Sequence, residues 1–204
     1  MLQDDDFGNK RKEKVRMRTY LSQPKADSQV FLEIKTKDQE GVGRKFRLLS
    51  TPISILNFMT KGHLDASITD TVVIEKVKKL HQDYKQAIKP RMYIYYDRYS
   101  LKEKKYIEGY DYHKIRITID QNLIYRDENV SLFAGNQGTP LLDDNTVIME
   151  IKAPGNKPQW LQDILDKYGL MEHKFSKYSC AYHKSQGLPY APRPSIESAG
   201  IAYA

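Results

Sequence analysis

Alternation of polar and apolar residues predicts three strands in the first quarter of the chain. In KVRMR, residues 14–18, every second residue is a cation and the residues between them are apolar. A strand places alternate side chains on opposite faces, so this spacing gives one cationic and one apolar face. The same pattern predicts strands over 13–20, 29–37 and 44–49, with polar connections at 23–27 and 38–41.

Two helices are predicted after these strands. Thr51-Pro52 is a cap followed by Pro at the first helical position, and Gly62 is a stop signal. This helix should bury Ile55, Leu56 and Phe58. A second helix over 71–89 has Asp70 as its cap and Pro90 as its end. Its apolar residues recur at helical spacing: Val73, Val77, Leu80, Tyr84 and Ile88.

The second half of the chain returns to strands, at 92–99, 114–120 and 147–152. Pro158 then starts a short helix that ends before Gly169. The apolar stripe predicted for it, with Trp160 as a packing residue, is Trp160, Leu161, Ile164, Leu165 and Tyr168. Strands with interposed helices and no βαβ alternation predict an antiparallel α+β fold. We expect one domain over residues 1–184 and a flexible tail, rich in Pro, Ser, Gly and Ala, over 185–204.

The composition favours an anionic binding partner but does not identify which one. The chain has 204 residues and a formal net charge of +7, which favours nucleic acid, a membrane surface, nucleotides or polyphosphate as a partner. One cysteine, Cys180, excludes a disulfide framework and a Cys-based zinc site. No apolar run approaches the roughly 20 residues of a membrane span, so we expect a cytoplasmic protein. No helix-turn-helix, zinc-finger or RNP signature predicts a specific nucleic-acid partner.

The alternation of charged residues recurs along the chain. It is found again in EIK at 33–35, RKFR at 44–47, KIRITID at 114–120 and MEIK at 149–152. An antiparallel sheet with one solvated face gives the same pattern. Cations outnumber acids on these faces, however, and Arg is frequent among them, which favours phosphate contacts. If such a sheet curls into a barrel, the cationic face lines a lumen for a polyanion.

Seven segments carry a family resemblance: KEKVRMRTY, VFLEIKTK, GRKFR, YIYYDRYS, KIRITIDQNL, VIMEIKAPGNKPQWL and HKFSKYS. In this order they resemble the VTC domain, the polyphosphate polymerase domain of the vacuolar transporter chaperone family and its bacterial relatives. That family belongs to the triphosphate tunnel metalloenzymes. The resemblance covers about residues 12–184. It implies an antiparallel β-barrel, or tunnel, with helices outside it, ATP and polyphosphate as partners, and Mn²⁺ or Mg²⁺.

The resemblance also implies a role for individual residues. Arg98, Arg116 and Lys177 would act on the transferring phosphoryl group. Glu150, with Glu33 as a second candidate, would bind the metal. The residues that would bind nucleotide or polymer phosphates are Arg16, Arg18, Lys35, Lys45, Tyr96, Lys152, Lys174 and Ser176. Tyr96 also fits a core position, and Asp120 fits either a tunnel residue or a turn former before Gln121-Asn122.

Two departures from the family pattern change the expectation. Relatives usually have an RYExKY strand, a helix and a YFDT-like strand before the KxRxR strand, and the residues before KVRMR do not match them. Relatives also tend to have Arg where this chain has Phe46. We therefore expect a tunnel that is incomplete at its N-terminal side and closed by a second copy or a membrane-protein partner. Hydrolysis of tripolyphosphate or nucleoside triphosphate on the same fold, and non-catalytic binding of polyphosphate or nucleotide, remain the alternatives to polymer synthesis.

Overall fold

The chain divides into two compact units, each with its own sheet and core. The computed structural model describes residues 12–37, 43–84, 88–102, 115–153 and 155–194. Unit 1 comprises Met1–Arg91 with Asn129–Gly135, and unit 2 comprises Met92–Glu128 with Asn136–Ala204.

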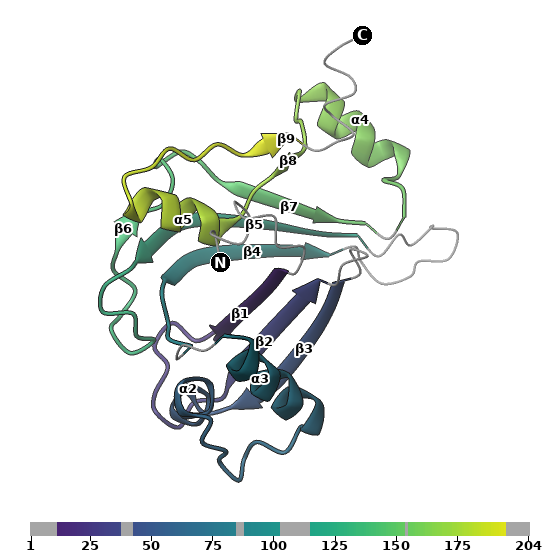
Figure 1. Ribbon diagram of the computed structural model, residues 1–204. Helices are drawn as coiled ribbons and strands as arrows, with labels where there is room; N and C mark the ends of the chain where they lie inside the picture. Colours follow the sequence, from purple (N-terminus) through teal and green to yellow (C-terminus); the bar gives the residue numbers. More distant parts are fainter. Residues whose placement is uncertain (1–11, 38–42, 85–87, 103–114, 154, 195–204) are drawn as a thin grey trace. The chain divides into compact units, whose positions relative to one another are not determined.

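Unit 1 is built on a three-stranded antiparallel sheet in the order β1-β2-β3 (Figure 1). Its strands are β1 (Lys12–Arg18), β2 (Val30–Lys37) and β3 (Gly43–Ser50), close to the predicted bounds. The central strand contributes Val30, Leu32 and Ile34 to the core. Its alternate residues therefore lie on the opposite face, as the sequence pattern predicts.

Two helices cover the apolar face of this sheet (Figure 1). They are α2 (Pro52–Lys61) and α3 (Thr71–Asp83). Thr51 caps α2 by accepting a hydrogen bond from the Ser54 backbone N–H, and Gly62 ends it with a φ of 69°. Asp70 caps α3 in the same way through the N–H of Val73. The predicted caps of both helices are thus confirmed.

Two details of these helices differ from the prediction. Leu56 is 39% exposed and Met59 is buried in its place, because the buried stripe of α2 runs through Pro52, Ile55 and Met59. Helix α3 ends at Asp83, and Tyr84 is its partly exposed C-cap residue instead of an interior one. Both errors came from assigning the buried stripe from hydrophobicity alone.

Unit 2 contains an antiparallel sheet with β5 (Arg116–Arg126) at its centre. β4 (Tyr93–Lys102) pairs with it along one edge, and β7 (Ile148–Lys152) and the short β6 (Thr139–Pro140) pair along the other. β5 continues six residues beyond Asp120. The alternative that Asp120 forms a turn is therefore wrong.

An extra residue in β5 explains how the strand continues. The register passes from Asp97↔Gln121 to Tyr95↔Ile124, so β5 uses one residue more than β4, and Asn122 lies there at a φ of 53°. Asn tolerates this left-handed conformation. Such a bulge reverses which residues of β5 face each side of the sheet. Beyond it, Leu123 and Tyr125 form an apolar cluster with the C-terminal helix of the unit.

Two helices and a two-stranded ribbon complete unit 2. They are α4 (Gln159–Lys167), α5 (Lys177–Ser185) and the pair β8 (His173–Lys174) and β9 (Arg193–Pro194). Cys180 and Ala181 of α5 pack against Leu123, Tyr125 and Leu141. Helix α4 buries Leu161 and Leu165 against β5 and β7 residues. Its other predicted apolar positions, Trp160, Ile164 and Tyr168, are 41–68% exposed, so their assignment to the core was wrong.

The segment predicted as a tail makes contacts as far as residue 194. Tyr190 packs edge-on against Phe175 with ring centroids 5.5 Å apart, and its hydroxyl accepts a hydrogen bond from the backbone N–H of Ser176. Several predictions fall outside the described residues: the connection at 38–41, Lys114, the helix portion at 85–87 and the tail over 195–204.

The predicted α+β class with antiparallel sheets is confirmed. In the described part of the chain the strands form three separate sheets, and no closed barrel is present among them. The β-tunnel implied by the resemblance therefore stays a prediction. Within the same residues, no helix has both the length and the apolar composition needed to cross a bilayer.

Gly138 tests the close approach of β5 and the segment that leads into β6. A Cβ atom there would lie 2.5 Å from the carbonyl oxygen of Tyr125 and 2.9 Å from the Ile124 side chain. We expect Gly138→Ala to lower the free energy of unfolding by about 1–3 kcal/mol, measured by urea denaturation, because backbone must shift. Gly43→Ala is the control, since nothing lies within 4 Å of a Cβ at Gly43. A Gly138→Ala protein as stable as this control would contradict the packing described.

Candidate functional site

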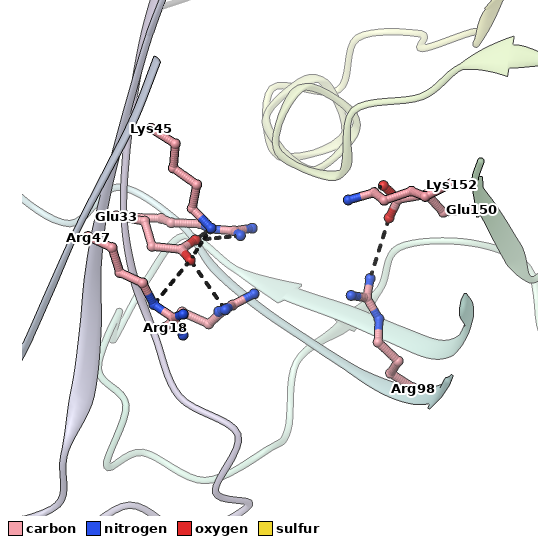
Figure 2. Close-up of polar contacts among 8 residues, drawn as sticks. Arg18, Glu33, Lys45, Arg47, Arg98, Glu150 and Lys152 are labelled. Carbon is pink, nitrogen blue, oxygen red and sulfur yellow. Dashed lines mark hydrogen bonds and ion pairs between the residues drawn. The ribbon is translucent and has the colours of Figure 1, made fainter. Parts of the chain in front are cut away.

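The polar face of the unit 1 sheet gathers four cations around one carboxylate. The register places Arg16, Glu33 and Arg47 side by side on three neighbouring strands. The Glu33 side chain has no exposed area. Its carboxylate points towards Arg18, Lys45 and Arg47 (Figure 2). The nitrogen–oxygen distances to its carboxylate are 2.6 Å for Arg16 Nη2, 3.2 Å for Arg18 Nη2, 2.8 Å for Lys45 Nζ and 3.9 Å for Arg47 Nε. We call these five residues the Glu33 cluster.

Electrostatics keep Glu33 ionised despite its burial. Burial alone would raise the pKa of Glu33, because a charged carboxylate loses its hydration. Hydrogen bonds from Lys45 and Arg16, together with the charges of Arg16 and Arg18, outweigh this effect and lower the pKa from 4.5 to about 2. The cations in turn gain a fixed anion, which offsets their mutual repulsion.

Aromatic rings support the two guanidinium groups at the edge of this cluster. The Arg47 guanidinium carbon lies 3.5 Å from the centre of the Phe31 ring, and that of Arg18 lies 4.6 Å from the Tyr20 ring. These are cation–π distances, which orient an arginine without using its N–H groups. Lys35 lies on the same sheet face, paired in register with Lys14 and Lys45, and is exposed.

The unit 2 sheet has a second cluster, around Asp120. Asp120 lies opposite Arg98 in the β4–β5 register, and its side chain has no exposed area. Arg98 holds it through two bonds, Nε to Oδ1 at 2.5 Å and Nη2 to Oδ2 at 2.7 Å. Lys177 Nζ lies 2.6 Å from Oδ2. Burial would raise the pKa of Asp120, but the bonds and charges of Arg98 and Lys177 lower it overall, and Asp120 in turn raises the pKa of Arg98.

Helix α5 brings Lys177 to this carboxylate. Ser176 is the N-cap residue of α5, and its Oγ accepts a hydrogen bond from the Ser179 backbone N–H. Lys177 is therefore the first residue of the helix. The ring of Tyr96 faces both cations, 5.1 Å from the Arg98 guanidinium carbon and 4.8 Å from Lys177 Nζ. Tyr96 also packs against the apolar cluster beneath α5, in agreement with the core position that the sequence allowed for it.

Glu150 lies at the open side of this second cluster. It is opposite Thr118 in the β5–β7 register, and its side chain is 45% exposed. One carboxylate oxygen lies 3.2 Å from Lys152 Nζ, and the other lies 4.0 Å from Arg98 Nη2 (Figure 2). We call Arg98, Asp120, Glu150, Lys152 and Lys177 the Asp120 cluster.

Two other predicted residues of unit 2 lie near or outside this cluster. Arg116 lies on the same face of the sheet, paired in register with Lys102 and Lys152, and is exposed. Lys174 lies in β8, paired with Arg193, and is exposed as well.

The two predicted metal ligands differ in how well they fit a divalent ion. Glu33 is fully buried and contacts four cations, so a metal ion would have to displace them to reach its carboxylate. Glu150 is half-exposed and more loosely paired. Mg²⁺ is often held by one or two carboxylates together with substrate phosphates and water, and Glu150 fits that pattern. In the described residues no three His, Cys, Asp or Glu side chains converge as a ready-made metal site.

The sequence pattern placed Arg47 and Asp120 on charged strand faces, but it did not identify either as part of a cluster around a buried carboxylate. Both lie at even spacing from predicted site residues, Arg47 two positions after Lys45 and Asp120 four after Arg116. For Asp120 the sequence left two alternatives open, a tunnel residue and a turn former, because Asp followed by Gln-Asn is also a turn sequence. Helix α5 was missed because only Cys180 and Ala181 of its nine residues are buried.

Comparison with known proteins gives one result. The family model described as "VTC domain" matches residues 1–185. No curated protein sequence and no solved structure matches the chain.

Glu33→Gln tests whether the buried carboxylate is ionised and stabilising. Because the folded-state pKa of about 2 lies below the ordinary 4.5, its contribution is present above pH 4.5 and is lost as the pH falls towards 2. We expect the substitution to lower the free energy of unfolding by roughly 3 kcal/mol at pH 7, and by much less at pH 2.5. Urea denaturation at both pH values measures this.

A matched control removes an exposed carboxylate of the same unit. Glu75 pairs with Lys78 at 3.0 Å, and its side chain is 69% exposed. Glu75→Gln should change the free energy of unfolding by about 0.5 kcal/mol or less at either pH. Equal losses in Glu33→Gln and Glu75→Gln would contradict the role of Glu33.

Proposed function

The chain belongs to the VTC-domain family, a family of polyphosphate-related function, and from this premise we propose that it is a metal-dependent polyphosphate polymerase domain. The reaction transfers the γ-phosphoryl group of ATP to the end of a polyphosphate chain. The observation that carries the proposal is the Asp120 cluster. In it Asp120 holds two cations, Arg98 and Lys177. A third cation, Lys152, and the accessible carboxylate of Glu150 lie beside them.

Transfer of the γ-phosphoryl group depends more on neutralising the charge of the phosphate oxygens than on a nucleophile from the protein. A terminal oxygen of the polyphosphate chain attacks the γ-phosphorus, and the bond between this phosphorus and the bridging oxygen of the β-phosphate breaks. ADP leaves, and the polymer is longer by one phosphate. Because both reactants are anions and negative charge spreads over the transferred oxygens, fixed cations lower the barrier.

The residues of unit 2 would have different roles in binding phosphate and neutralising its charge. Arg98 and Lys177 are held in place by Asp120 and would contact the transferring phosphoryl group. Arg116 and Lys152 extend the cationic face along β5 and β7. Tyr96 would keep the two central cations over its ring, and Ser176 would keep Lys177 at the start of α5. Lys174 is two residues before Ser176 and would contact phosphates farther along the chain.

The Glu33 cluster of unit 1, taken by itself, would also bind phosphates of nucleotide or polymer. Its four cations face one carboxylate, so positive charge remains in excess within the cluster. Arg16 and Lys45 are nearly half-exposed, and Lys35 is exposed beside them, so all three can reach a ligand. Arginine forks suit phosphate oxygens geometrically.

Glu150 would hold Mn²⁺ or Mg²⁺, with phosphate oxygens supplying further ligands. Bound there, the ion would neutralise phosphate charge and help to fix the phosphates. Glu150 fits this role because its carboxylate is accessible and is not enclosed by cations, whereas Glu33 and Asp120 are.

The test is direct synthesis. Purified protein incubated with ATP and Mn²⁺ should form polymer that is visible as a ladder on a stained gel, together with ADP. Free phosphate without polymer would identify a hydrolase instead. Absence of both products, with salt-sensitive binding of tripolyphosphate measured by calorimetry, would identify a non-catalytic binding protein.

Glu150→Gln tests the metal assignment separately. We expect the Mn²⁺ concentration for half-maximal activity to rise at least tenfold, because the ion loses its one charged protein ligand. Binding of tripolyphosphate in the presence of a chelator should be unchanged or tighter, since one negative charge is removed. Glu75→Gln, on the surface of α3, serves as the control. An unchanged metal requirement in Glu150→Gln would refute the assignment.

A further inference from the structure

Asp120 differs from Glu150 in that its side chain has no exposed area and both of its oxygens are held at short distances, whereas Glu150 is 45% exposed and more loosely paired. Oδ1 accepts from Arg98 Nε, and Oδ2 accepts from Arg98 Nη2 and lies 2.6 Å from Lys177 Nζ. The side chain is fully enclosed. A carboxylate in this position is poorly placed to meet a substrate or a metal ion, but well placed to control the two cations that hold it.

The pairing fixes the orientation of Arg98. A guanidinium group has five N–H bonds in one plane. Asp120 takes one from Nε and one from Nη2, so the plane and direction of the fork are set along one edge. Nη1 lies outside this pair. The ring of Tyr96 lies 5.1 Å from the guanidinium carbon and restricts Arg98 further.

Lys177 is constrained by the same carboxylate from a different element. It starts α5, which is anchored by the packing of Cys180 and Ala181 on the β5 side chains beyond the bulge. Its ammonium group has three donors, and the contact with Oδ2 uses one of them. Asp120 therefore ties a strand cation and a helix cation to a common point. Without it these two like charges would repel each other.

We propose that Asp120 is the positioning residue of the site: its buried carboxylate holds Arg98 and Lys177 so that their remaining N–H groups face the transferring phosphoryl group. The inference rests on the proposed function, because it assigns Arg98 and Lys177 to that group. Asp120 itself touches neither substrate nor metal.

This role predicts opposite effects on binding and on turnover. Asp120→Asn removes a negative charge close to the phosphate-binding cations, so attraction for a polyanion is kept or strengthened. It also removes the charged bidentate partner of Arg98, so the cations lose their alignment with the transition state. We expect kcat to fall at least tenfold while the KM for ATP and the Kd for tripolyphosphate stay equal or decrease. A loss of folded protein lowers kcat but does not tighten binding.

Asp97→Asn is the matched control. Asp97 is the neighbour of Arg98 on β4, and it accepts hydrogen bonds from Tyr95 and Asn122. The substitution removes the same charge one residue away, on a side chain that alternation directs to the other face of the strand. We expect less than a twofold change in kcat for it.

A second measurement reads the position of Arg98 without turnover. In a ¹⁵N-correlated NMR spectrum, the Arg98 Nε–H signal should be shifted and protected from exchange in the wild type and in Asp97→Asn, and lost or shifted back in Asp120→Asn. If Asp120→Asn fails to fold, Asp120→Glu keeps the charge but displaces the carboxylate by one methylene. It should show the same fall in kcat with binding retained.

The outcomes separate the two proposals. A wild type that neither binds tripolyphosphate nor makes polymer overturns the proposed function, and the role of Asp120 falls with it. A wild type that makes polymer, with kcat in Asp120→Asn or Asp120→Glu equal to that of Asp97→Asn, overturns only the role of Asp120. Parallel losses of kcat and tripolyphosphate affinity would also overturn it, since they would show a simple loss of binding.

Discussion

Each sheet face depends on one buried carboxylate that offsets part of the repulsion among the cations around it. Glu33 has four such cations and Asp120 has two in direct contact. Without the acid, like charges on neighbouring strands would repel each other and splay apart into solvent. With it, each cation has a fixed partner and a defined direction. Removing one member of a buried pair leaves an uncompensated charge, which costs about 3–5 kcal/mol, so the arrangement constrains the fold as well as the site.

Apolar packing on the opposite faces of the strands stabilises the sheets that carry these buried carboxylates. Leu32 and Ile34 pack beneath Glu33 with α2 and α3, and Ile117 and Ile151 pack on the other side of the sheet from Asp120 with α4. Rigid apolar cores hold the strands in one register. Register matters here because a slip by one residue would turn Glu33 towards the core and Leu32 and Ile34 towards solvent. The packing of the core and the geometry of the charges therefore depend on the same strand pairing.

Much of this could be predicted from the sequence because it is local. Alternation gave the strands of unit 1 and the residues on their charged faces, and the caps Thr51 and Asp70 gave the starts of two helices. Exposed helix positions such as Leu56 and Trp160 were assigned wrongly, because hydrophobicity does not say which side of a helix meets a neighbour. The anchoring role of Asp120 depends on α5, which is 57 residues farther along the chain. A local sequence pattern cannot predict a contact between residues so far apart in the chain.

The bulge at Asn122 shows most clearly why local patterns are insufficient. Before it, the even residues of β5, Thr118 and Asp120, belong to the charged face; beyond it, Leu123 and Tyr125 take that side and receive α5. One strand therefore presents a polar surface at one end and an apolar docking surface at the other. Because α5 docks on the apolar end, its first residue, Lys177, reaches Asp120, the last residue of the charged face before the bulge. A single extra residue in β5 thus lets α5 pack where its first residue, Lys177, meets Asp120. Asn122 tolerates the left-handed backbone conformation of the bulge, but an Asn in a sequence does not by itself predict one.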